Sequence, residues 1–168
     1  MTNRLVVFDC DGTLVDSQHS ICAAMTRAFE EARLSPPDRP AILSVVGLSL
    51  PHAMARLLPE AHSDFHDHLA ERYKLAFQAL RRAEGVQEPL YPGIVDLLVA
   101  LEESGWLLGV ATGKSDRGLD LCLAHHGVRD RFVTLQTADR HPSKPHPSML
   151  LTAMAEAGAA PETTVMIG

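Results

Sequence analysis

Two aspartates stand two positions apart, directly after a short apolar run. In DCDGTLVDS, Asp9 and Asp11 follow the apolar residues Leu5–Phe8. Two carboxylates this close repel each other unless a cation lies beside them. One carboxylate can attack phosphorus and form an aspartyl phosphate, while the other can give a proton to the leaving oxygen and later take one from water. The pair therefore indicates phosphoryl chemistry, with Mg²⁺ as the hard cation that suits carboxylate ligands.

Two further motifs carry groups that suit the same chemistry. In ATGKS, Thr112 brings a hydroxyl donor and Gly113 exposes its backbone N–H, and in PSKPHP, Lys144 brings a cation that could hold nucleophile and phosphate together. Backbone N–H groups at Asp11 and Gly12 could cradle phosphate oxygens. Each motif alone is weak, because DxDG is often a turn or part of a calcium loop and T-G-K is often an ordinary turn. Their order along the chain favours a phosphate site.

The second half of the chain alternates helices and strands. Strands are expected at Trp106–Ala111, Phe132–Gln136 and Thr163–Ile167, and helices around residues 94–101, 116–126 and 147–157 each precede one of them. This alternation is typical of a parallel sheet with right-handed crossovers. Ligands of such sheets bind at the carboxyl ends of the strands, where the three motifs fall.

The segment after the aspartates is helical instead. Helical spacing predicts a helix that begins after a Ser17 cap, a shorter helix around residues 52–58 and a long one around residues 63–83, with SPPDRP (35–40) ending the first. We therefore predict an α/β fold whose doubly wound, Rossmann-like parallel-sheet core comprises residues 1–16 and 89–168. Residues 17–88 form an inserted, all-helical cap domain.

Composition narrows the range of partners. The 168 residues are 46% apolar and 21% charged, which suits one globular unit, and the formal net charge of −6 without a basic run argues against nucleic acid. No apolar stretch is long enough for a membrane span, and the N-terminus is unlike a signal peptide. Three cysteines without metal-site spacing favour a reduced, cytoplasmic protein. Cys10 is expected in buried packing, and the histidines His62 and His66 on a solvated surface.

The stretches VVFDCDGTLVDS, YPGIVDLLVALEESGWLLGVATGKS and SKPHPSMLLTAMAEAGAAPETTVMIG resemble the haloacid dehalogenase superfamily. The resemblance is to its phosphoglycolate-phosphatase-like hydrolases with a helical cap, and it covers essentially the whole chain. It implies that Asp9 is the nucleophile and a Mg²⁺ ligand. It also implies that Asp11 is the general acid and base and binds the metal through its carbonyl, and that Thr112 and Lys144 complete the catalytic set.

The function expected from these residues is Mg²⁺-dependent hydrolysis of a small phosphorylated metabolite, such as phosphoglycolate, through phospho-Asp9. Gly12, Thr13 and Gly113 would contact the substrate phosphate. Gly47 and Lys74 are candidate cap contacts, and the alternatives are a simple turn for Gly47 and a solvated helix face for Lys74. Lys114 either touches phosphate or lies on the surface. Nothing in the sequence indicates an oligomeric state.

Other functions stay open at this point. A phosphomutase or a phosphonatase would use the same motifs, the latter with Lys74 as a Schiff-base lysine. A phospho-acceptor signalling domain would carry its aspartate after a middle strand and would have no helical cap.

In the resembled family the strand TTVMI runs on into an acidic motif, whereas the sequence given ends at Gly168. We therefore expect a fragment or a shortened member of the family whose Mg²⁺ site has few protein ligands, or a chain that only binds phosphate or a partner. Val165–Ile167 would lie unpaired on one side.

Overall fold

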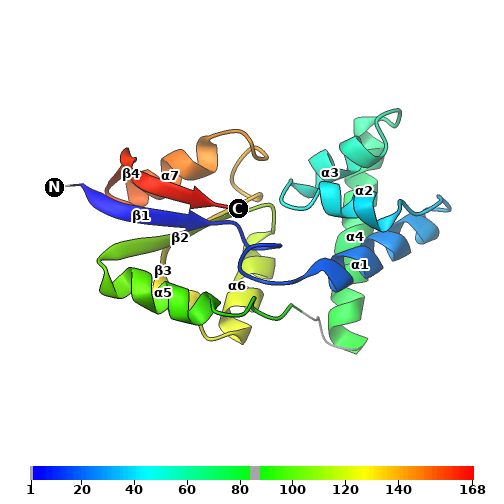
Figure 1. Cartoon of the computed structure of the whole chain (residues 1–168). Coiled ribbons are helices and arrows are strands. Elements are labelled where there is room, and N and C mark those ends of the chain that lie inside the picture. The colour runs from blue at the N-terminus through cyan, green and yellow to red at the C-terminus, as the bar shows by residue number, and fades with distance from the viewer. Residues whose placement is uncertain (1, 84–87) are drawn as a thin grey trace.

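The computed structural model describes residues 2–83 and 88–168. Within them, one sheet of four parallel strands has the order β3-β2-β1-β4 (Figure 1). The strands are β1 (Asn3–Phe8), β2 (Trp106–Thr112), β3 (Phe132–Thr137) and β4 (Ala159–Ile167). β1, the first strand in sequence, therefore lies inside the sheet between strands from the second half of the chain.

Helices cover both faces of this sheet. α5 (Ile94–Glu103) and α6 (Asp116–His125) pack on one face, and α7 (Ser148–Ala157) packs on the other. Alternate residues of β1 serve the two faces, since Val6 and Phe8 join the cluster of α5 and α6 while Leu5 and Val7 join that of α7. A strand buried on both faces reads as a continuous apolar run, as the last four residues of β1 do. The prediction of a doubly wound α/β core is confirmed.

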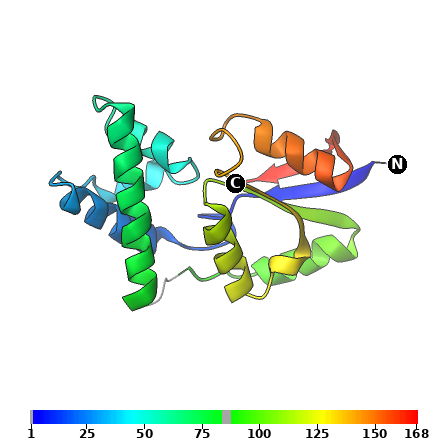
Figure 2. The same cartoon turned by 180° about the vertical axis from the view of Figure 1, so that it is seen from behind.

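The four helices of the N-terminal half form a separate block with its own apolar core. They are α1 (Gln18–Glu31), α2 (Arg39–Ser44), α3 (Leu50–Leu57) and α4 (Ser63–Ala83). Their core residues include Met25, Phe29, Ile42, Met54 and Leu69. Figures 1 and 2 show this block beyond the carboxyl edge of the sheet, towards which β1 points. We call it the cap. Its exact boundaries at residues 16/17 and 88/89 stay a prediction, and residues 84–87 lie outside the described ones.

α2 was not expected, because SPPDRP suggested only a break. Asp38 caps this helix, with its Oδ1 accepting a hydrogen bond of 2.9 Å from the N–H of Ala41. Pro40 stands in the first turn, where its missing N–H would have no helical partner in any case. α1 already ends at Glu31, before Ser35, so the proline-rich segment starts the next helix rather than ending the first one.

β4 is an edge strand and is longer than predicted. Val165, Met166 and Ile167 are each more than a third exposed, as expected for a strand paired on one side only. The small 3-10 helix Arg129–Arg131 leads into β3. In the described part of the chain, no helix combines the length and the apolar character that crossing a bilayer requires.

Candidate active site

Asp9 lies where β1 ends, in the middle of the sheet's carboxyl edge. Its N–H donates to the carbonyl of Ile167 (2.9 Å), which ties it to the end of β4. Its Oδ1 accepts the N–H of Cys10 at 2.7 Å, and its Oδ2 lies 3.0 Å from Nζ of Lys144. Both oxygens therefore have a fixed donor, and the carboxylate is held in one orientation.

Burial raises the pKa of Asp9 above its usual value. The Lys144 ammonium and the Cys10 N–H oppose that rise in the pKa, and the neighbouring Asp11 carboxylate adds to it. The side chain is only 13% exposed, so its charge is poorly solvated and depends on Lys144. A carboxylate in this state is a better nucleophile than one fully hydrated in water.

Lys144 joins two strand ends. Besides the ion pair with Asp9, its Nζ donates to the carbonyl of Ala111 in β2 (3.1 Å). It precedes a cis peptide bond to Pro145. Next to it, Oγ of Ser143 accepts the N–H of Ser49 from the cap at 2.9 Å. The loop that carries Lys144 thus contacts both the nucleophile and the cap.

A tight turn sets the position of Asp11. Gly12 has a φ of +81°, a conformation that favours glycine. The Gly12 N–H donates to Val15 (2.9 Å) and the N–H of Thr13 donates to Cys10 (3.2 Å). The expectation that the Gly12 N–H is available to a phosphate oxygen is therefore wrong, because that donor closes the turn. The N–H of Asp11 remains a proposed donor, and Thr13, half-buried beside it, remains a proposed contact.

The Asp11 carboxylate has two partners of its own. Its Oδ1 accepts the hydroxyl of Ser17 at 2.6 Å and lies 3.2 Å from Nζ of Lys114. Ser17 occupies the N-cap position of α1, but its hydroxyl makes no bond to the helix backbone. The predicted cap residue therefore holds the proposed acid instead.

Lys114 lies inside the site, although the sequence left open whether it touches phosphate or lies on the surface. It is 11% exposed, so the surface alternative is wrong, and its Nζ also lies 2.9 Å from Oε1 of Glu88. Burial lowers the pKa of Lys114, but the carboxylates of Asp11 and Glu88 outweigh burial and raise it above its usual range. The ammonium is therefore permanently charged. The position of Lys114 after a strand hinted at a site, whereas nothing local pointed to Glu88.

Thr112 and Gly113 end β2 beside these groups. Thr112 is fully buried, and its Oγ1 accepts the N–H of Lys114 (3.1 Å), which shapes the turn that brings Lys114 inward. A Cβ on Gly113 would lie 2.3 Å from the carbonyl oxygen of Leu48 in the cap. Only a glycine allows the cap to approach this closely.

The cap loop of residues 47–49 reaches the nucleophile. Gly47 has a φ of +94°, and a Cβ there would lie 3.1 Å from Oδ2 of Asp9 and 3.9 Å from Nζ of Lys144. Gly47 is thus part of a turn and is also the cap residue that lies over Asp9. The cap and the core meet directly above the paired aspartates.

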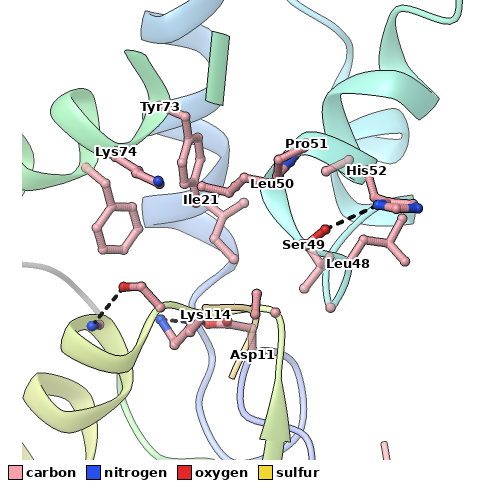
Figure 3. Close-up of a pocket in the computed structure, with 18 of the residues that line it drawn as sticks. Asp11, Ile21, Leu48, Ser49, Leu50, Pro51, His52, Tyr73, Lys74 and Lys114 are labelled. Carbon is pink, nitrogen blue, oxygen red and sulfur yellow. Dashed lines mark hydrogen bonds and ion pairs between the residues drawn. The ribbon is translucent and has the colours of Figure 1, made fainter. Parts of the chain in front are cut away.

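A cavity of about 590 Å³ opens between cap and core. Asp11 and Lys114 lie at its floor, and Tyr73, Ile21 and Leu50 lie above them (Figure 3). Lys74 also lines it, but this side chain is 46% exposed and forms an ion pair of 2.6 Å with Glu71. The structure therefore brings Asp9, Asp11, Thr112, Lys144, Gly47 and Gly113 together, and leaves Lys74 on the cavity's outer part.

The two aspartates at this edge are a partial fit to Mg²⁺. Within residues 2–83 and 88–168, no group of three histidine, cysteine or acidic side chains is placed to hold a metal. Mg²⁺ in proteins often takes only one or two carboxylates and fills its remaining positions with water and substrate phosphate. The Asp9 carboxylate and the Asp11 backbone carbonyl are compatible with that smaller donor set. His66 instead bonds the carbonyl of Leu58 at 2.7 Å, which is a structural role within the cap.

A parallel sheet with paired aspartates at its carboxyl edge and a helical cap above them defines a capped α/β enzyme. More narrowly, the chain belongs to the haloacid dehalogenase-like hydrolases, a family whose pattern matches residues 6–168. The predictions of this family and of a hydrolase are confirmed.

Relatives bearing phosphatase names agree with that assignment. The chain is 37% identical over 169 residues to "Probable phosphatase IndB" of Dickeya dadantii, with 98% of this chain and 72% of that protein covered. It is 31% identical to a phosphoglycolate phosphatase of Pseudomonas putida, with 98% and 62% covered. A crystal structure of a hydrolase from Pseudomonas syringae matches with a TM-score of 0.83 and 25% identity, over all of this chain and 76% of that one. The chain thus spans between 62% and 76% of the length of each of these proteins.

Proposed function

We propose that this site hydrolyses a phosphomonoester through a phospho-Asp9 intermediate, with Mg²⁺ as cofactor and a small phosphorylated metabolite as substrate. One observation carries the proposal. The Asp9 carboxylate, oriented by Lys144 and the Cys10 N–H, lies beneath a closed cap loop with a second carboxylate two residues away. The names of the relatives support phosphatase chemistry, and cytoplasmic location stays a prediction.

Each residue receives a role from its position. Asp9 attacks phosphorus, and Lys144 offsets the charge that gathers between carboxylate and phosphate. Asp11 gives a proton to the leaving oxygen and takes one from the attacking water in the second half-reaction. The Thr112–Lys114 turn places a buried cation beside Asp11. Closure by Gly47 and Gly113 keeps bulk water from the nucleophile.

Mg²⁺ would be held by the carboxylate of Asp9 and the backbone carbonyl of Asp11. When bound, it supplies positive charge that lowers the repulsion between the nucleophile and a phosphate dianion. The residues of this chain orient the carboxylates and exclude water.

The phosphonatase alternative is disfavoured by one contact. A Schiff-base lysine must be uncharged to attack a carbonyl, whereas Lys74 forms an ion pair with Glu71 and is half exposed. A phosphomutase would keep the same core as a phosphatase. The two functions differ in the molecule that accepts the phosphoryl group. Water as acceptor releases inorganic phosphate, while a mutase returns the phosphoryl group to a sugar.

The test is hydrolysis of p-nitrophenyl phosphate by this chain across a Mg²⁺ titration, with Asp9→Asn as the inactive partner. We expect metal-dependent release of phosphate by the unaltered chain and none by the variant. Acid quench followed by mass spectrometry should find one phosphoryl group on the peptide that contains Asp9. Turnover that survives in Asp9→Asn would remove the proposed intermediate.

A further inference from the structure

The cavity is far larger than a two-carbon substrate requires. Pockets that bind drug-sized molecules range from about 300 to 1,000 Å³. The cavity between cap and core measures about 590 Å³, in the middle of that range. The organic part of phosphoglycolate, two carbons and a carboxylate, would leave most of this volume to water.

One wall of the cavity is aromatic. Tyr73 and Phe77 stand four residues apart on α4, and both line the cavity. Their ring centroids are 5.9 Å apart with an interplanar angle of 34°. Burial, with the Asp11 carboxylate nearby, raises the pKa of Tyr73, so its phenol stays neutral. Leu48, Leu50 and Ile21 also line this space (Figure 3).

The aromatic wall begins at the catalytic groups. Nζ of Lys114 lies 3.2 Å from Asp11 and 5.6 Å from the centroid of the Phe77 ring. If Asp11 protonates the leaving oxygen, the organic group attached to that oxygen enters the cavity beside Phe77. It then passes the Lys114 ammonium and reaches the face of the Phe77 ring.

Three of the five lysine and arginine side chains that line the cavity are paired with carboxylates. Lys114 pairs with Asp11 and Glu88, Lys74 pairs with Glu71, and Arg81 lies 3.9 Å from Glu88. A substrate carboxylate would have to compete for these three cations, whereas Arg82 and Arg117 also line the cavity and have no carboxylate partner among the described residues. An uncharged, flat group needs no such partner and gains from contact with the rings.

We propose, on the basis of the phosphatase function above, that the substrate is the phosphomonoester of an alcohol that carries an aromatic ring. The phosphate lies at Asp9 and Lys144. The ring packs against Tyr73 and Phe77 and buries its surface in the apolar part of the cavity.

The test compares phosphomonoesters whose leaving alcohols are all primary, so that differences report binding more than bond cleavage. Ethyl phosphate, phosphoglycolate, 2-cyclohexylethyl phosphate and 2-phenylethyl phosphate are titrated by calorimetry into the Asp9→Asn chain with Mg²⁺ present. Burying a ring should tighten binding of 2-phenylethyl phosphate by roughly tenfold or more over ethyl phosphate. Phosphoglycolate should bind no better than ethyl phosphate.

Two variants of α4 locate the preference. Phe77→Leu keeps apolar volume in the cap and removes the ring, so the ratio of phenylethyl to ethyl affinity should fall by severalfold. Leu75→Ala is the matched control, because Leu75 is on the same helix but 63% exposed, and it should leave the ratio unchanged. The melting temperature of each variant shows that the cap is folded.

The outcomes separate this inference from the function on which it rests. Equal affinity for ethyl and phenylethyl phosphate overturns it, as does a tighter fit of phosphoglycolate. A cyclohexyl ester that binds as well as the phenyl ester overturns the aromatic preference. Tight, Phe77-dependent binding of phenylethyl phosphate supports it. If the unaltered chain then shows no turnover of any ester, the proposed phosphatase function fails while the recognition stands.

Discussion

Gly113 is the point at which the backbones of cap and core come closest. A methyl group there would lie 2.3 Å from the carbonyl oxygen of Leu48, 2.8 Å from its carbonyl carbon and 2.9 Å from the carbonyl oxygen of Gly47. All three atoms belong to the backbone, so no side-chain rotation can relieve the overlap. Ordinary contacts begin at 3.4 Å, so Gly113→Ala must push the cap loop away by about 1 Å.

That displacement falls on the loop that covers the nucleophile. Gly47 would move away from Asp9, and the N–H of Ser49 would move away from Ser143. A misplacement of about 1 Å at an active site costs on the order of 100-fold in rate. We therefore expect kcat/KM for p-nitrophenyl phosphate to fall by roughly that factor in Gly113→Ala. Its circular dichroism spectrum should be unchanged, because neither core loses a side chain.

The control is Gly118→Ala in α6. There the nearest atom to a new Cβ is Oγ of Ser115 at 3.2 Å, a hydroxyl that can shift by a few tenths of an ångström. Its activity should stay within about threefold of the unaltered chain, well short of a 1 Å misplacement. If Gly113→Ala also stays within that range, contact between the Gly47 loop and the core is irrelevant to catalysis, and the argument from the close approach fails.

Three further substitutions test the charges. Because burial raises the pKa of Asp9, the ionised carboxylate lowers the stability of the fold at pH values above that pKa. Asp9→Asn should therefore unfold at a higher urea concentration than the unaltered chain at pH 7. The difference between the two midpoints should shrink as the pH falls. Lys144→Met removes a group that lowers the pKa of Asp9, so the acidic limb of the pH–rate profile should move to higher pH, and kcat should fall by about 100-fold or more. Lys114→Met leaves the buried carboxylates of Asp11 and Glu88 without their cation and should lower the free energy of unfolding by about 3–5 kcal/mol. Adding Glu88→Gln should recover part of that loss in a double-mutant cycle by urea unfolding.

The sequence predicted the elements whose signals are local. The last four residues of β1 are a continuous apolar run, and a motif residue follows it at once, so both the strand and the place of Asp9 could be read directly. The long helix α4 has the predicted bounds Ser63–Ala83, because its apolar spacing persists over many turns. Cys10 is fully buried in the sheet's core, as expected. Each of these inferences needs only neighbouring residues.

The contacts between distant segments could not be read in this way. Glu88 and Lys114 are 26 residues apart, and only the folded chain shows that they share an ion pair. The close approach of Gly113 to Leu48 likewise depends on how the cap sits on the core. The Gly12 N–H was misassigned because the sequence shows that a turn is present but not which carbonyl closes it. Pattern therefore predicts which residues reach the edge of the sheet, and packing decides what each one touches there.

The question raised by two adjacent aspartates has an electrostatic answer in this structure. Each carboxylate has a lysine of its own, Lys144 for Asp9 and Lys114 for Asp11, so the repulsion between them is offset by residues of the fold itself. The lysine beside Asp11 is also shared with Glu88, whereas the lysine beside Asp9 has a backbone carbonyl as its other partner. Because only one carboxylate offsets the charge of Lys144, this lysine is the better placed of the two to attract an arriving phosphate. A phosphate dianion there would still exceed one positive charge, and in the proposed reaction Mg²⁺ would supply the difference.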